Sequence, residues 1–225
     1  MQEHEQHHNG QALGVEVQDA PASHANADAI REDHMEHLCD EYRRHRREEG
    51  ATKAARQWID RPFEAWLAGF GGDGTALDDE SIAALSAAMV VSLPVRDAMI
   101  LSLIAPESCG DKAMMIRFAS SPHEPQVQVR MCRELQRAFH DDSHRPDLQR
   151  CQRGADMLAD MIVRLPDRFA VQPMVILAYV MWWIGDSRAA AFALHCLSVD
   201  DDCTLAAIIC SAVHRGIMPA WIGRQ

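Results

Sequence analysis

The sequence predicts an all-α fold, a multi-helix domain of about nine to eleven helices with a tetratricopeptide-like helical hairpin at the C-terminus. Apolar residues recur at spacings of three and four along most of the chain, and no segment alternates as a half-buried strand does. Ala and Met are common, Tyr is scarce and β-branched runs are few, which is typical of helical proteins. With 225 residues, the chain is long enough to bury most of its apolar surface.

The chain divides near residue 28 into a polar segment and a helical one. Residues 1–27 are rich in Gln, His, Ala and Gly without a hydrophobic period, so we expect a disordered polar tail. Residues 28–225 are expected to form a single all-helical domain. Its first helix is predicted over residues 29–49, where a thin apolar stripe follows helical spacing. The stripe consists of Ile30, Met35, Leu38 and Tyr42.

The second helix is predicted over residues 53–70, with a bend or break at Pro62, because proline removes a backbone donor from the helix interior. The glycine-rich segment 69–75 follows as a loop. It has the glycines of a phosphate-binding loop but lacks the Gly-Lys-Ser/Thr signature and a preceding strand. We therefore expect no nucleotide site there.

Three helices are predicted between residues 78 and 119. Asp78 or Asp79 can cap the first of them, because a short carboxylate satisfies free backbone N–H groups at a helix start. Pro94 begins the second helix and Pro106 ends it, and residues 112–119 form a short third one.

Two amphipathic helices are predicted next, over residues 127–139 and 147–165. Pro166 and Pro173 are expected to bracket a connection that leads to the C-terminal hairpins. The apolar run 174–184 has eleven residues, fewer than the roughly 20 that span a bilayer, so it predicts a buried central helix.

Small-residue helices are predicted over 189–197 and from residue 205, separated by the acidic turn Asp200–Asp202. We expect the large apolar side chains of this region to be buried, and Tyr179, Trp182 and Trp183 to belong to the core rather than to a ligand site. The residues expected in the core are Leu177, Trp183, Phe192 and Leu194.

The cysteines indicate a reducing compartment. Their number is odd, no Cys-x-x-Cys motif occurs, and no basic leader precedes an apolar stretch. We therefore expect free thiols and a cytoplasmic location. The seven are Cys39, Cys109, Cys132, Cys151, Cys196, Cys203 and Cys210.

Two resemblances follow from the motifs. Residues 178–202 resemble the second half of a tetratricopeptide unit, with an acidic turn in place of its usual proline. Residues 60–222 resemble the C-terminal helical part of an actinobacterial family called domain of unknown function 4192. This resemblance implies an actinobacterial cytoplasmic protein and no particular activity or functional residue. Its motifs are Leu85-Ser-Ala-Ala-Met89, Leu93-Pro-Val-Arg-Asp-Ala98, Leu177-Ala-Tyr179, Trp183-Ile-Gly-Asp186 and Gly216-Ile-Met-Pro219.

Three histidine groups are candidate metal ligands, because neutral imidazole binds transition metals. None has the spacing of a metal motif such as His-Glu-x-x-His, so we predict no metal site and no cofactor. The groups are His4, His7 and His8 in the tail, His34 and His37 beside Asp33, and His140 and His144 beside Asp141 and Asp142.

The charged residues provide one further candidate. The basic run Arg43–Arg47 is surrounded by acidic residues at helical spacing and predicts a solvated helix face. Arg96 and Asp97 fall within the family-like motif and form a possible functional or structural anchor, because a buried arginine is usually paired.

The overall charge bears on the function. A net charge of −11 argues against nucleic acid and an anionic membrane as partners, since both attract basic surfaces. No linear catalytic signature occurs. The sequence favours a noncatalytic binding or regulatory domain whose partner is another, basic protein. The alternative is a helical hydrolase or metal-dependent enzyme that uses the His and Asp groups.

Overall fold

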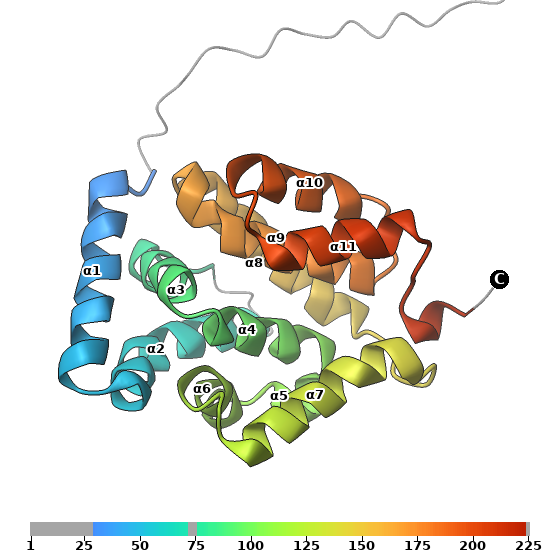
Figure 1. Cartoon of the computed structure of the whole chain (residues 1–225), viewed down its shortest axis with the longest axis horizontal. Coiled ribbons are helices and arrows are strands. Elements are labelled where there is room, and N and C mark those ends of the chain that lie inside the picture. Colours follow the sequence, from blue (N-terminus) through green and yellow to red (C-terminus); the bar gives the residue numbers. More distant parts are fainter. Residues whose placement is uncertain (1–28, 72–75, 224–225) are drawn as a thin grey trace, which may run out of the picture.

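The computed structural model describes residues 29–71 and 76–223, and over these ranges the chain is all-α, with eleven α-helices and no strand (Figure 1). The predicted tail 1–27, with His4, His7 and His8, lies outside the described residues. The helices are α1 (Glu32–Glu48), α2 (Ala51–Ala68), α3 (Asp79–Val91), α4 (Pro94–Ile104), α5 (Pro106–Cys109), α6 (Lys112–Ser120), α7 (Pro125–His140), α8 (Leu148–Arg164), α9 (Asp167–Trp183), α10 (Ala189–Val199) and α11 (Thr204–His214), followed by the 3₁₀ turn η1 (Ala220–Ile222).

Helix α9 is the centre of the fold. Every residue from Pro173 to Trp183 is buried, so this part of the helix has no face toward solvent. Five helices surround it, namely α3, α4, α8, α10 and α11. A helix that is apolar on all sides is stable in water only when neighbours cover it completely. The predicted burial of Leu177 and Trp183 is confirmed.

Two prolines lie inside helices, at Pro62, where a bend or a break was predicted, and at Pro173, where a connection was predicted. Helix α2 continues through Pro62 without a break, and α9 continues through Pro173, so the connection predicted over 166–173 is wrong. Only Leu165 and Pro166 separate α8 from α9. Both Pro62 and Pro173 are buried among apolar neighbours. The burial of the helix around each proline outweighs the loss of one backbone hydrogen bond.

Polar caps and glycines set several helix ends. The side chain of Asp78 accepts a hydrogen bond from the Ser81 N–H, which confirms the predicted cap of α3. Gly185 ends α9 with a φ of 78°, in the left-handed region that favours glycine. The N–H of Asp186 then donates to the carbonyl of Met181 at 2.8 Å, which reverses the chain toward α10.

Helices α10 and α11 form a hairpin that packs on α9 at the edge of the molecule (Figure 1). Helix α10 buries only Ala189, Ala193 and Cys196. Their small side chains let it approach α9 closely, and the Cys196 thiol lies 3.7 Å from the Val171 carbonyl oxygen. Leu194 belongs to another face of the helix.

The predicted burial of Leu194 is therefore wrong. Its side chain is 60% exposed, and Phe192 is half-buried. An edge helix buries one face only, and the spacing of the small residues, not the size of the leucine, decides which face that is.

The described helices provide no single segment with the length and hydropathy of a membrane span. Helices α3 and α4 satisfy both criteria only when they are taken together, and they bend by 116° at the break between them.

Two leucines test this assignment of core and surface. We expect Leu177→Ala to lower the free energy of unfolding by about 2–5 kcal/mol, because it leaves a cavity beside α9. Leu194→Ala removes the same atoms from an exposed site and should change the free energy of unfolding by less than about 0.5 kcal/mol. Chemical denaturation of both variants measures the difference. Equal losses would contradict the burial described here.

Candidate functional site

Arg96 and Asp97 connect α4 to α9. The guanidinium of Arg96 donates to one carboxylate oxygen of Asp97 at 2.9 and 2.8 Å, and to the side-chain oxygen of Gln172 on α9 at 3.4 Å. The Arg96 side chain is 13% exposed. Burial raises the pKa of Tyr179, and the charge of Asp97 raises it further. The pair thus has the geometry of an anchor between two core helices.

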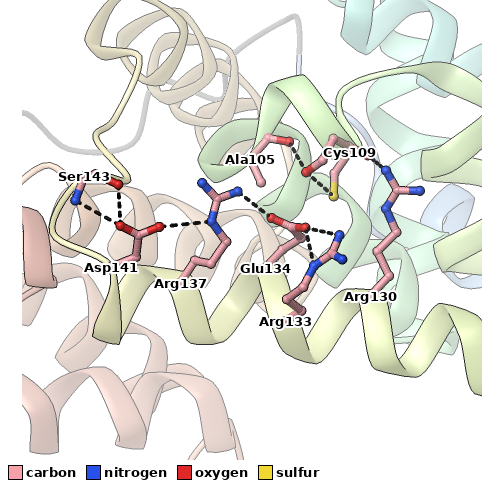
Figure 2. Close-up of polar contacts among 9 residues, drawn as sticks. Ala105, Cys109, Arg130, Arg133, Glu134, Arg137, Asp141 and Ser143 are labelled. Carbon is pink, nitrogen blue, oxygen red and sulfur yellow. Dashed lines mark hydrogen bonds and ion pairs between the residues drawn. The ribbon is translucent and has the colours of Figure 1, made fainter.

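The His140 group is dispersed rather than assembled into a ligand set. Asp141 accepts hydrogen bonds from the backbone and hydroxyl of Ser143 and from Arg137 (Figure 2). The ring of His144 instead packs on Trp183, with 5.3 Å between the ring centroids. Burial lowers the pKa of His144. Within ranges 29–71 and 76–223, no three His, Cys, Asp or Glu side chains are arranged to hold a metal ion.

A buried glutamate on α7 is the strongest polar feature beside this group. Glu134 is 1% exposed and accepts hydrogen bonds from Arg133 at 2.8 and 3.1 Å and from Arg137 at 3.1 Å. Figure 2 shows the network running along α7 from Asp141 to Arg133, opposite the segment that contains Ala105 and Cys109. Sequence reasoning missed Glu134, although arginines one residue before it and three after it were a signal.

Glu134 and the two arginines form an ion-pair network within α7. Burial alone raises the pKa of its carboxyl, but the hydrogen bonds from Arg133 and Arg137 outweigh this and leave the pKa below its ordinary value. Both carboxylate oxygens already accept hydrogen bonds. A carboxylate held ionised in this way is a poor general base, because catalysis needs a pKa near the working pH.

A polar pocket of about 290 Å³ opens beside this network. It is lined by residues 104–108, by residues 143–145, and by Arg137 and Asp147. Next to it, Arg130 donates to the carbonyl oxygen of Ser108 at 2.8 Å. This hydrogen bond joins α7 to α5.

The other charged candidates lie on α1. Arg43 donates to Asp40 at 2.9 Å, and Arg44 lies 3.8 Å from Glu41. These pairs agree with the prediction of a solvated face for residues 43–47. His34 and His37 are exposed on the same helix.

The α10–α11 hairpin carries a different kind of surface, which we call the hairpin face. Its positions follow the spacing i, i+3, i+4, i+7 on both helices, and all eight residues are exposed. Leu194 is 60% exposed and Ile208 is 54% exposed. The hairpin face consists of Ala191, Leu194, His195 and Ser198 on α10 and of Thr204, Ala207, Ile208 and Ser211 on α11.

The two helices of the hairpin contain no Asp, Glu, Lys or Arg among their 22 residues. The whole chain is 24% charged, and exposed helix positions are where charged residues usually stand. The lack of charged residues on these helices is visible in the sequence, where it predicts that both helices are buried. In the structure the residues of the hairpin face are instead exposed to solvent.

Comparisons of the chain with protein-family models, with curated proteins and with solved structures find no match. The resemblances drawn from the sequence motifs therefore stay predictions.

Replacing the buried carboxylate tests its role in the ion-pair network. We expect Glu134→Gln to lower the free energy of unfolding by about 1–3 kcal/mol at neutral pH, because two arginines lose their charged acceptor. The pKa of Glu134 is lowered by folding. Its stabilisation is therefore complete above the unfolded-state pKa of about 4.3 and is lost as the pH falls through the folded-state pKa.

Denaturant titrations over a series of pH values measure this difference. The gap between wild type and Glu134→Gln should close toward acid pH. Glu107→Gln, at an exposed glutamate nearby, is the matched control and should change stability by less than about 0.5 kcal/mol. A gap that stays constant down to acid pH would show that the ionised carboxylate is not what stabilises α7.

Proposed function

We propose that the chain is a noncatalytic protein-binding domain that docks its partner on the hairpin face. One observation carries the proposal, namely that two neighbouring helices without Asp, Glu, Lys or Arg each expose a large apolar side chain, Leu194 on α10 and Ile208 on α11. Contiguous apolar surface on a protein marks interaction sites more often than isolated apolar residues do.

The position of the two large side chains suits a binding site. Leu194 lies six residues before Asp200, and Ile208 lies six residues after Asp202. Because each helical residue advances the chain by about 1.5 Å, we expect the two side chains to stand at similar heights along the hairpin. Side chains of this kind at the centre of an interface supply most of its energy.

The remaining residues of the hairpin face are suited to close packing. Ala191, Ala207, Ser198 and Ser211 are small, so a partner helix can approach the hairpin backbone closely. Helical hairpins at the end of a stack usually have a polar outer face when they stay in water. The absence of charged residues from these two helices thus supports a face that a partner covers.

The rim of the face is charged at both ends. The turn Asp200–Asp202 lies at one end of α11, and Arg215 lies at the other. Charged groups at a rim contribute to the choice and orientation of a partner more than to affinity. The rim therefore supports recognition of a partner that carries charges of both signs.

Site-specific photo-crosslinking in cells that produce the protein tests the proposal. We expect a photoreactive residue at position 208 to give discrete covalent adducts, and a Leu194→Glu change to abolish them. The matched control is position 129 on α7, where Val129 is 69% exposed and lies outside the hairpin. Mass spectrometry identifies the adducts. Equal labelling at both positions would count against a binding role for the hairpin face.

A further inference from the structure

We infer that the partner on the hairpin face is a second copy of this chain, with the two α11 helices antiparallel across a two-fold axis at Ile208. This inference rests on the binding role proposed above for the hairpin face. The distribution of charge around Ile208 favours a second copy as the partner.

The two ends of α11 carry opposite charges, on either side of Ile208. The acidic turn Asp200–Asp202 precedes the helix and Arg215 follows it, and Asp201 and Arg215 are each seven residues from Ile208 in the sequence. A two-fold axis that makes two helices antiparallel places each residue opposite the one at the same distance on the other side of the axis. The acidic turn of each copy then meets the basic end of the other.

These charges are available for such contacts. Asp201, Asp202 and Arg215 are exposed, and none of the ion pairs among the described residues involves them. At about 1.5 Å per residue, Arg215 lies roughly 10 Å along the helix from the axis. A parallel arrangement would instead place like charges together at both ends, which is unfavourable.

The lack of charged residues on α10 and α11 reduces the electrostatic repulsion between two copies at this face. Each copy carries a net charge of −11, so two copies repel each other over most of their surface. The hairpin face has no acidic side chain, and its ends have opposite signs. It is therefore a surface on which two acidic copies can meet without placing carboxylates against each other.

The apolar centre fits the same arrangement. Ile208 of one copy packs on Ile208 of the other at the axis, and the two Leu194 side chains flank it at the same height. The four helices then form a small bundle. Two 11-residue helices offer less than the roughly 800 Å² per partner of a standard interface, so we expect a dimer that dissociates on dilution.

Sedimentation velocity of the full chain, from low to high micromolar concentration, tests the inference. We expect the average mass to rise from that of the monomer toward that of the dimer. Ile208→Glu should keep the chain monomeric throughout, whereas Val129→Glu, at a still more exposed site on α7, should behave as wild type. A wild-type chain that stays monomeric at every concentration would overturn the inference.

Charge reversal tests the antiparallel register. Asp201→Lys alone and Arg215→Glu alone each place like charges opposite one another in both symmetric contacts, so each should weaken self-association about three- to tenfold. Mixing the two variants makes both contacts attractive and should restore association as a heterodimer. Failure of the mixture to associate better than either variant alone would overturn the two-fold register.

The oligomeric state and the adducts formed at position 208 together distinguish self-association from binding of another protein. If the chain is monomeric but position 208 still crosslinks to another protein, the hairpin face binds a partner that is not a second copy. If position 208 gives neither self-adducts nor other adducts, the binding role itself fails. Adducts between two copies that disappear with Ile208→Glu would support both.

Discussion

The complete burial of helix α9 is the constraint on which the rest of the structure depends. From Pro173 to Trp183 the helix has no polar side to turn toward water, so neighbours must cover it on every side. Helices α3, α4, α8, α10 and α11 provide this cover. Each of these helices therefore turns one face toward α9, and α10 and α11, at the edge of the molecule, leave another face exposed.

Helices α10 and α7 are stabilised by different interactions. Helix α10 reaches it through small residues, with Cys196 in contact with the α9 backbone. Helix α7 packs mainly on α4, α6 and η1, and near its end Phe139 stacks on Trp182 of α9, with 5.1 Å between the ring centroids. Within α7 the buried carboxylate of Glu134 is neutralised by Arg133 and Arg137 of the same helix (Figure 2). The free energy needed to remove these charges from water offsets much of the attraction between Glu134 and its arginines. The network therefore contributes more to the choice of one helix arrangement than to stability.

The edge position of α10 and α11 explains why they are the candidate functional surface. One face of each is used for the core, and the opposite face retains Leu194 and Ile208 in solvent. Two candidate site residues from the sequence, His144 and Arg96, make contacts that belong to the packing of the helices. His144 packs on Trp183, and Arg96 joins α4 to α9.

The sequence by itself determined the all-helical class, the buried apolar helix near 174–184 and the cap at Asp78, because hydrophobic period and capping chemistry are local properties. Only the tertiary structure decided that α2 and α9 continue through Pro62 and Pro173, since the opposing energies come from helices distant in sequence. It alone placed Glu134 inside and Leu194 outside. Burial depends on which face of a helix meets its neighbours, and an apolar edge helix such as α10 offers several faces of nearly equal hydrophobicity.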